Sequence, residues 1–160
     1  MEKTIGQHLE EMFQEASQSY IRNLLTNETD RAGFDAIRQI AADRRDELTR
    51  RYEEDYPARV EVARQHLYDE AAKLKLDHPS PSGASTNDDE TITRQAHREV
   101  QSAHQADLQA VRDEARQEFE RILDHADLHE GARGLAREVF GRSLDRESRQ
   151  EQRSITRSQD

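Results

Sequence analysis

Several residue types are absent or scarce in this sequence, which has no cysteine, no tryptophan and only three prolines. The absence of cysteine excludes disulfides, thiol catalysis and cysteine-ligated zinc. No apolar run approaches the roughly 18 residues that a membrane-spanning helix needs. Acidic residues also interrupt the N-terminal segment, where a signal peptide would be apolar. We therefore expect a cytoplasmic protein with no membrane partner.

Apolar residues are scarce as well. They make up 32% of the chain against 36% charged residues, whereas globular domains carry about 45–50% apolar residues. A deep core is therefore not expected. The apolar residues nevertheless recur at steps of three and four, which a disordered chain would not show. This combination is typical of long helices and predicts an all-α protein.

Five helices are predicted, over residues 5–26, 31–55, 57–76, 88–129 and 132–144. Thr4 and Gln7 form a capping box at the start of the first helix. That helix has the cleanest amphipathic stripe of the chain, made of Ile5, Leu9, Met12, Phe13, Ala16, Tyr20 and Leu24. Asp30 is a plausible N-cap for the second helix.

Pro57 and residues 77–87 mark the breaks in the middle of the chain. Proline fits the first turn of a helix and is costly inside one, so either a new helix starts at Pro57 or one long helix is kinked there. Residues 77–87 hold the other two prolines and read as a mobile loop. Asn87 and Glu90 then form a second capping-box pattern, and Gly131 closes the long helix that follows.

The apolar face of the helix over residues 88–129 changes direction along its length. The first half presents small residues such as Ala103 and Ala106, whereas the second presents Val111, Phe119 and other large ones. At about 100° per residue, the two faces differ by roughly a quarter turn. We therefore expect the two halves to pack against different neighbours.

These helices predict an elongated helical bundle in a single domain over residues 1–144. The loop would fold the chain into a long antiparallel helical hairpin, a coiled-coil-like stalk in which Leu74 meets Ile92. All four phenylalanines would lie together at the thick end. Residues 145–160 would form a polar, disordered, arginine-rich tail. Because an alanine-rich stalk buries little apolar surface, self-association into a dimeric four-helix bundle is expected.

Histidines and carboxylates give weak signals for chemistry. His125 and His129 stand four residues apart, a spacing that suits a metal ion, but the HExxH pattern of metalloproteases is absent. Favourable contact with the C-terminal end of the helix is the preferred interpretation of this pair. A position at the edge of the helix seam is preferred for His97 and His104. Adjacent carboxylates such as Glu53 and Glu54 point about 100° apart and are interpreted as solvated faces.

The C-terminal arginines are the strongest functional signal. They recur at steps of four, three, four and four, and would form one basic stripe if this segment were helical: Arg142, Arg146, Arg149, Arg153 and Arg157. Such a stripe suits phosphates or an acidic protein surface. Residues 131–160 carry a charge of +2, from seven arginines and five acidic residues, in a chain of net charge −10. A solubilising tail is the preferred alternative.

From these patterns we expect no enzyme, no cofactor, no metal and no catalytic residue. The predicted function is a helical protein–protein interaction module, an adaptor, assembly or chaperone-like factor that forms a homodimer and binds an unidentified protein. The alternative is a nucleic-acid-associated accessory protein that uses only the arginine-rich C-terminal segment, because the acidic body disfavours general nucleic-acid binding.

Overall fold

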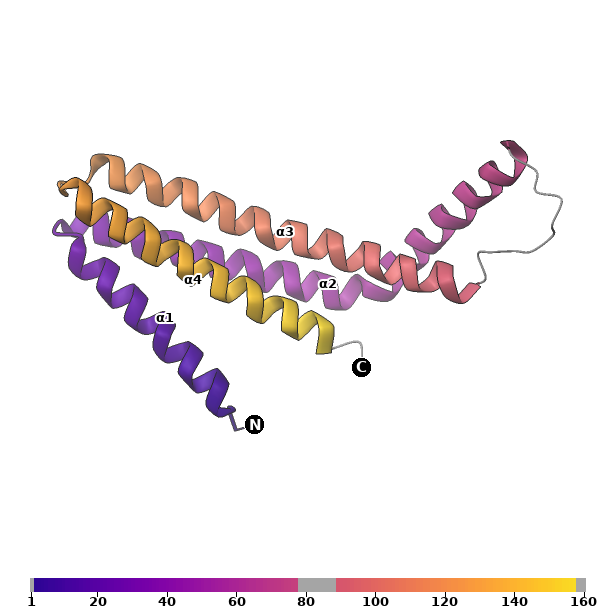
Figure 1. Cartoon of the computed structure of the whole chain (residues 1–160), viewed down its shortest axis with the longest axis horizontal. Coiled ribbons are helices and arrows are strands. Elements are labelled where there is room, and N and C mark those ends of the chain that lie inside the picture. The colour runs from indigo at the N-terminus through magenta and orange to yellow at the C-terminus, as the bar shows by residue number, and fades with distance from the viewer. Residues whose placement is uncertain (1, 78–88, 158–160) are drawn as a thin grey trace. The chain divides into compact units, whose positions relative to one another are not determined.

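The computed structural model describes residues 2–77 and 89–157. These residues form four helices and no strand: α1 (Ile5–Leu24), α2 (Glu28–Asp77), α3 (Asp89–His125) and α4 (Glu130–Arg157) (Figure 1). None of the helices in the described ranges is long and apolar enough to cross a bilayer. The predicted all-α helical bundle is confirmed. Residues 78–87 of the predicted loop, including Asn87, lie outside the described residues.

The start of α1 follows the predicted capping box. The backbone N–H of Gln7 donates to Thr4 Oγ1 at 3.2 Å, and the backbone N–H of Thr4 donates to Gln7 Oε1 at 2.9 Å. These two bonds satisfy backbone donors that the first helical turn leaves without partners. The helix is therefore ordered from Ile5 onwards.

The start of α2 differs from the prediction, whereas its middle follows the alternative of one long helix at Pro57. Asn27, and not Asp30, caps the helix, because Asn27 Oδ1 accepts from the backbone N–H of Thr29 at 2.7 Å. Pro57 lies inside α2, so the two predicted helices over residues 31–55 and 57–76 are one helix. The ribbon of α2 changes direction in its second half (Figure 1), as expected when proline removes a backbone hydrogen bond.

The junction of α3 and α4 lies earlier than predicted. α3 ends at His125 instead of residue 129, and α4 begins at Glu130. His129 Nδ1 accepts from the backbone N–H of Ala132 at 3.1 Å, so this histidine caps the N-terminus of α4. Gly131 lies in the first turn of α4, whereas the sequence predicts that it closes the preceding helix.

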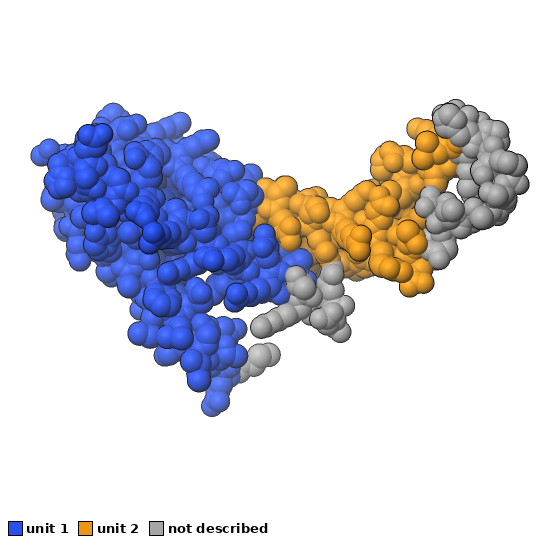
Figure 2. All heavy atoms as spheres, viewed as in Figure 1, with its two compact units in different colours: residues 1–44, 109–160 blue, residues 45–108 orange. Residues whose placement is uncertain are grey.

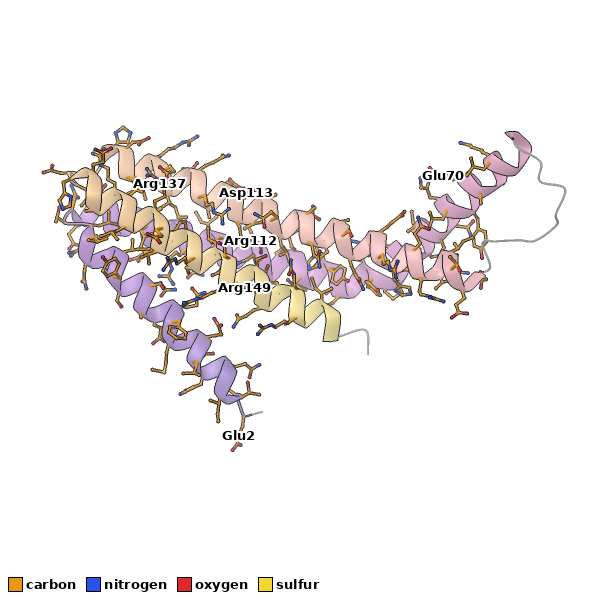
Figure 3. All side chains as sticks on the ribbon, viewed as in Figure 1. Glu2, Glu70, Arg112, Asp113, Arg137 and Arg149 are labelled. Atoms are coloured by element: carbon orange, nitrogen blue, oxygen red, sulfur yellow. The ribbon has the colours of Figure 1, made fainter. Side chains whose placement is uncertain are left out.

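The polar C-terminal segment is helical up to Arg157, which corrects the disordered tail expected over residues 145–160. Arg116 of α3 donates to Asp145 at 2.9 Å, and the buried Arg112 pairs with Glu151. Ile155 is buried as well. The segment is thus fixed on α3 mainly by ion pairs, which a search for apolar periodicity does not detect. Figure 3 labels Arg112 on α3.

The described residues form two compact units (Figure 2). Unit 1 comprises residues 1–44 and 109–160, and unit 2 comprises residues 45–108. Both α2 and α3 contribute residues to each unit. The single domain predicted over residues 1–144 stays a prediction. The two units are defined by their contacts, whereas a domain is defined by whether it folds on its own.

Unit 1 is built around three phenylalanines from different helices. Phe34 of α2, Phe119 of α3 and Phe140 of α4 have ring centroids 4.5–5.9 Å apart. Ile21 and Leu25 add the C-terminal end of α1 to this core. Phe13 does not join it and is 50% exposed, so the prediction that all four phenylalanines lie together is wrong.

Unit 2 is an antiparallel pairing of α2 and α3. Contacts join Tyr52 to His104 and, further along α2, Arg64 to Asp89, so positions rise on one helix as they fall on the other. Its core is small and contains Tyr52, Val60, Ala96 and Val100. Leu74, predicted to meet Ile92, is 62% exposed.

The buried face of α3 turns along the helix, as predicted. The steps of four residues from Ile92 to Leu108 each advance the face by about 40°, so Leu108 and Phe119 lie roughly a quarter turn or more from the face of Ile92, Ala96 and Val100. Ala103, Ala106 and Ala110 are exposed, and His104 is buried in their place. His104 is followed by Leu108 and Val111 on the same face. The turn is therefore real, but these alanines predicted for the first half of the face are exposed, because the buried His104 lies between the two halves.

Candidate protein-interaction surface

The apolar stripe of α1 is exposed along most of its length. Five large side chains are between 42% and 82% exposed: Ile5, Leu9, Met12, Phe13 and Tyr20. We call these five residues, with Ala16, the α1 stripe. Single exposed apolar residues are ordinary, but a continuous stripe of them on one helix indicates an interaction site.

The face of α1 that turns towards the rest of unit 1 is largely polar. Glu10, Gln14 and Ser17 are partly buried, whereas their apolar neighbours on the stripe are exposed. At about 100° per residue, the two faces lie roughly a third of a turn apart. In its last turn, α1 instead packs on the core of unit 1 through Ile21, Leu24 and Leu25.

Polar contacts hold the middle of α1 against α4. Gln14 Nε2 donates to the backbone carbonyl of Ser143 at 3.1 Å, and the Ser143 hydroxyl donates to Gln14 Oε1. The guanidinium of Arg146 lies over the Phe13 ring, 4.5 Å from its centroid. Towards its N-terminus, α1 diverges from α4 (Figure 1). The N-terminal half of the helix is thus ordered but little covered by its own unit.

The arginines predicted to form a stripe do lie on one face of α4, but they differ in their contacts and exposure. Arg142 pairs with Glu138 and Arg146 lies on Phe13, so neither is a free cation. Arg149 and Arg153 are exposed, and Figure 3 labels Arg149 on α4. Arg157 is the last residue of the helix, and its side chain lies outside the described part of the chain.

His125 and His129 do not form a paired site at one helix end. His125 is the last residue of α3, whereas His129 uses Nδ1 to cap α4. The preferred interpretation of both as C-terminal residues of one helix is therefore wrong for His129. In the described ranges, no three histidine or acidic side chains are grouped so that they could hold a metal ion.

His97 and His104 lie in the seam of unit 2. The His104 ring is 2% exposed and stacks on the Tyr52 ring, with centroids 4.0 Å apart and planes at 4°. Tyr56 Oη is hydrogen-bonded to His97 Nδ1. Burial lowers the pKa of His104 below 6.5 and raises the pKa of Tyr52 to about 12. The expected seam-edge position fits His97, whereas His104 is inside the seam.

Adjacent carboxylates on the helices pair with arginine, as expected for solvated faces. Glu47 accepts from Arg50 and Arg51 at 2.7–2.9 Å, and these bonds lower the pKa of Glu47 to about 2. Glu114 pairs with Arg44. Asp113 accepts from Gln109 at 2.9 Å. Each of these carboxylates is engaged by a donor and exposed to water, an arrangement that suits solubility and helix stability.

A shallow groove of about 220 Å³ runs between α2 and α3 in unit 1. Ile37, Ile40 and Val111 line it, and Arg44 and Glu114 lie at its edge. Small-molecule sites usually occupy about 300–1,000 Å³ and combine apolar walls with converging polar groups. This groove is smaller, and Arg44 and Glu114 at its edge pair with each other.

Comparisons with protein-family models, with curated proteins and with solved structures give no match to this chain.

Proposed function

We propose that this chain is a non-enzymatic helical protein–protein interaction module that acts in the cytoplasm and associates with itself. The α1 stripe carries the proposal, because it combines five exposed large apolar side chains with an ordered helix and a polar inner face. An adaptor, assembly or chaperone-like role needs such a recognition helix and no catalytic group.

The charges of the chain support a protein partner over a lipid surface. Residues 1–28 carry an excess of acidic residues, which anionic membranes repel. Peripheral membrane helices instead place lysine or arginine beside their apolar face. A helix that is apolar on one side and acidic on the other is suited to bind in an apolar groove of a partner protein or to pair with a second helix.

A capture experiment tests the interaction module. The immobilised full chain is exposed to native lysate that contains a separately tagged copy of the same chain. We expect it to retain protein that the double substitution Leu9→Glu and Met12→Glu fails to retain. Val62→Glu serves as the matched control, because Val62 is 71% exposed on α2 and outside the stripe. Retention of nothing beyond the bare matrix by the unchanged chain would contradict the proposal.

A nucleic-acid accessory role is the second candidate, favoured by the helical structure of residues 142–157. The exposed Arg149 and Arg153 then stand on one face, spaced by one turn of helix. We expect RNA or DNA binding that weakens steeply as salt rises and that is lost when both are changed to glutamine. Absence of any mobility shift at low salt would end this alternative.

A further inference from the structure

We propose that the α1 stripe is the contact between two copies of this chain, paired antiparallel about a twofold axis beside Met12 and Phe13. This inference rests on the proposed function and names its partner surface. The positions of the stripe are symmetric about that point: Ile5, Leu9, Met12, Phe13, Ala16 and Tyr20 are separated by steps of four, three, one, three and four. A twofold interface requires such a self-complementary surface.

The antiparallel register places each side chain of the stripe at the level of an apolar side chain of the second copy. Ile5 of one copy lies at the level of Tyr20 of the second, and Met12 lies at the level of Phe13. Leu9 lies at the level of Ala16, so a large side chain meets a small one. Alternation of large and small residues lets two helix surfaces interlock at close distance. A parallel pairing would place Leu9 against Leu9 and Ala16 against Ala16, with a gap at the latter.

Charges beside the stripe agree with the same register. His8 and Glu15 are seven residues apart, so they lie on one flank of α1, and both are exposed. A twofold axis brings equal flanks together, which places His8 of one copy within about 3 Å, measured along the axis, of Glu15 of the second. An imidazole can donate to a carboxylate. The symmetry repeats this pair at the opposite end of the contact.

The exposed area is near what a stable dimer needs. With about 200 Å² for a fully exposed large side chain, the five exposed fractions correspond to roughly 550 Å² of surface. A standard interface takes about 800 Å² from each partner. Ala16 and the polar flanks of α1 supply the remainder.

The N-terminal half of α1 itself benefits from such a partner. An isolated helix shorter than about 12–15 residues is marginal in water, and the residues before Gln14 make few contacts with their own unit. The capping box at Thr4 keeps this half helical. Pairing with a second copy covers the stripe over its whole length.

The mass of the full chain in solution tests whether the stripe pairs. We expect sedimentation equilibrium to give twice the chain mass of 18.6 kDa at micromolar concentration. Leu9→Glu is expected to weaken the dimer at least ten-fold, because a charge would be buried without a partner. Val62→Glu, the matched exposed substitution, should leave the mass unchanged. Circular dichroism should show that Leu9→Glu stays helical, since Leu9 is not in the core.

Single cysteines test the register, since the chain has none of its own. Met12→Cys lies beside the twofold axis and should form a disulfide with its own copy on oxidation. Ile5→Cys alone should not, because the two positions lie about 22 Å apart along the antiparallel pair. A mixture of Ile5→Cys and Tyr20→Cys chains should give a linked heterodimer.

The outcomes separate this inference from the proposed function. A dimer that survives Leu9→Glu overturns the inference and leaves self-association standing. If the chain is monomeric and captures another protein through the stripe, a second copy is not the partner of the stripe, and the proposed interaction module still holds. Linkage of Ile5→Cys to itself, with no link to Tyr20→Cys, overturns the antiparallel register. A monomer that captures nothing overturns both proposals.

Discussion

His104 is the residue at which polarity and burial conflict most sharply in unit 2. Its ring stacks on Tyr52, and the charged groups around it are Asp107 on its own helix with Glu53 and Arg59 on α2. Burial has the largest effect on its pKa and lowers it, since a buried imidazolium loses hydration. The seam of unit 2 therefore contains a neutral histidine.

We predict that His104 makes unit 2 less stable as the pH falls. The folded pKa lies below the unfolded value of 6.5, so the unfolded chain binds more protons. The stability that the neutral His104 contributes is complete above pH 6.5 and is lost as the pH falls from there through the pKa of the folded state. Urea unfolding at pH 7.5 and 5.5 measures the difference.

His104→Gln is the control for this pH effect. At pH 7.5 it should cost about 1 kcal/mol through loss of the stacked ring. Between pH 7.5 and 5.5 it should lose less stability than the unchanged chain. An equal loss in both proteins would show that other groups cause the acid sensitivity.

His129 has a separate structural role that a substitution can test. His129→Ala removes the acceptor for the backbone N–H of Ala132, and we expect a loss of about 1 kcal/mol in the free energy of unfolding. His129→Asn restores a capping acceptor and should recover most of this loss. Equal unfolding midpoints for the two variants would contradict the capping role.

At the scale of the helices, α4 shows that ion pairs can extend a helix beyond its apolar pattern. Only Ile155 is apolar after Leu144, yet the helix continues to Arg157. The buried Arg112 requires a charged partner, and Glu151 supplies it from α4. A charged side chain on one helix can therefore determine where another helix ends.

Two glycines in α4 offer a test of helix propensity without a change in packing. A Cβ atom at Gly134 or Gly141 would meet no neighbouring atom within 4 Å. Alanine at either position should therefore stabilise the protein by about 0.5–1 kcal/mol, because glycine loses more backbone freedom in a helix. Thermal unfolding of each variant measures this gain.

Gly33 in α2 is the matched control. A Cβ atom there would lie 3.2 Å from Ile122 Cδ1, so alanine would have to displace a side chain packed against the core of unit 1. We expect Gly33→Ala to gain less than the α4 variants. An equal gain at all three positions would show that Ile122 moves away without cost.

At the scale of the whole molecule, the two units differ in how much apolar surface they bury. Unit 1 contains three packed phenylalanines and residues from all four helices, whereas the core of unit 2 comes from two helices. Both units contain part of α3, so the local stability of the two units can be compared along this one helix.

We predict that native-state hydrogen exchange differs along α3. Amides of residues 111–123 should exchange at least about ten-fold more slowly than those of residues 92–104, because local opening requires less energy where less apolar surface is buried. Mass spectrometry of peptides from the full chain measures both segments. Equal protection would instead support the single cooperative domain predicted over residues 1–144.

The sequence predicted those parts of the fold that depend on local chemistry. Helical periodicity indicated the all-α class, and the Thr4 capping box is confirmed in detail. The buried His104 and the continuation of α4 were missed because both depend on contacts with another helix. Periodicity revealed the α1 stripe but could not show that its own fold leaves it exposed, since amphipathicity does not identify what covers a face.

The exposed stripe on a chain of net charge −10 has a consequence for ionic strength. Two acidic copies repel each other in dilute buffer, and added ions screen that repulsion while sulfate strengthens apolar association. Arginine–phosphate contacts respond in the opposite sense. The ionic conditions that favour the proposed α1 pairing are therefore those that would weaken any nucleic-acid binding by α4, so the two surfaces would rarely be occupied together.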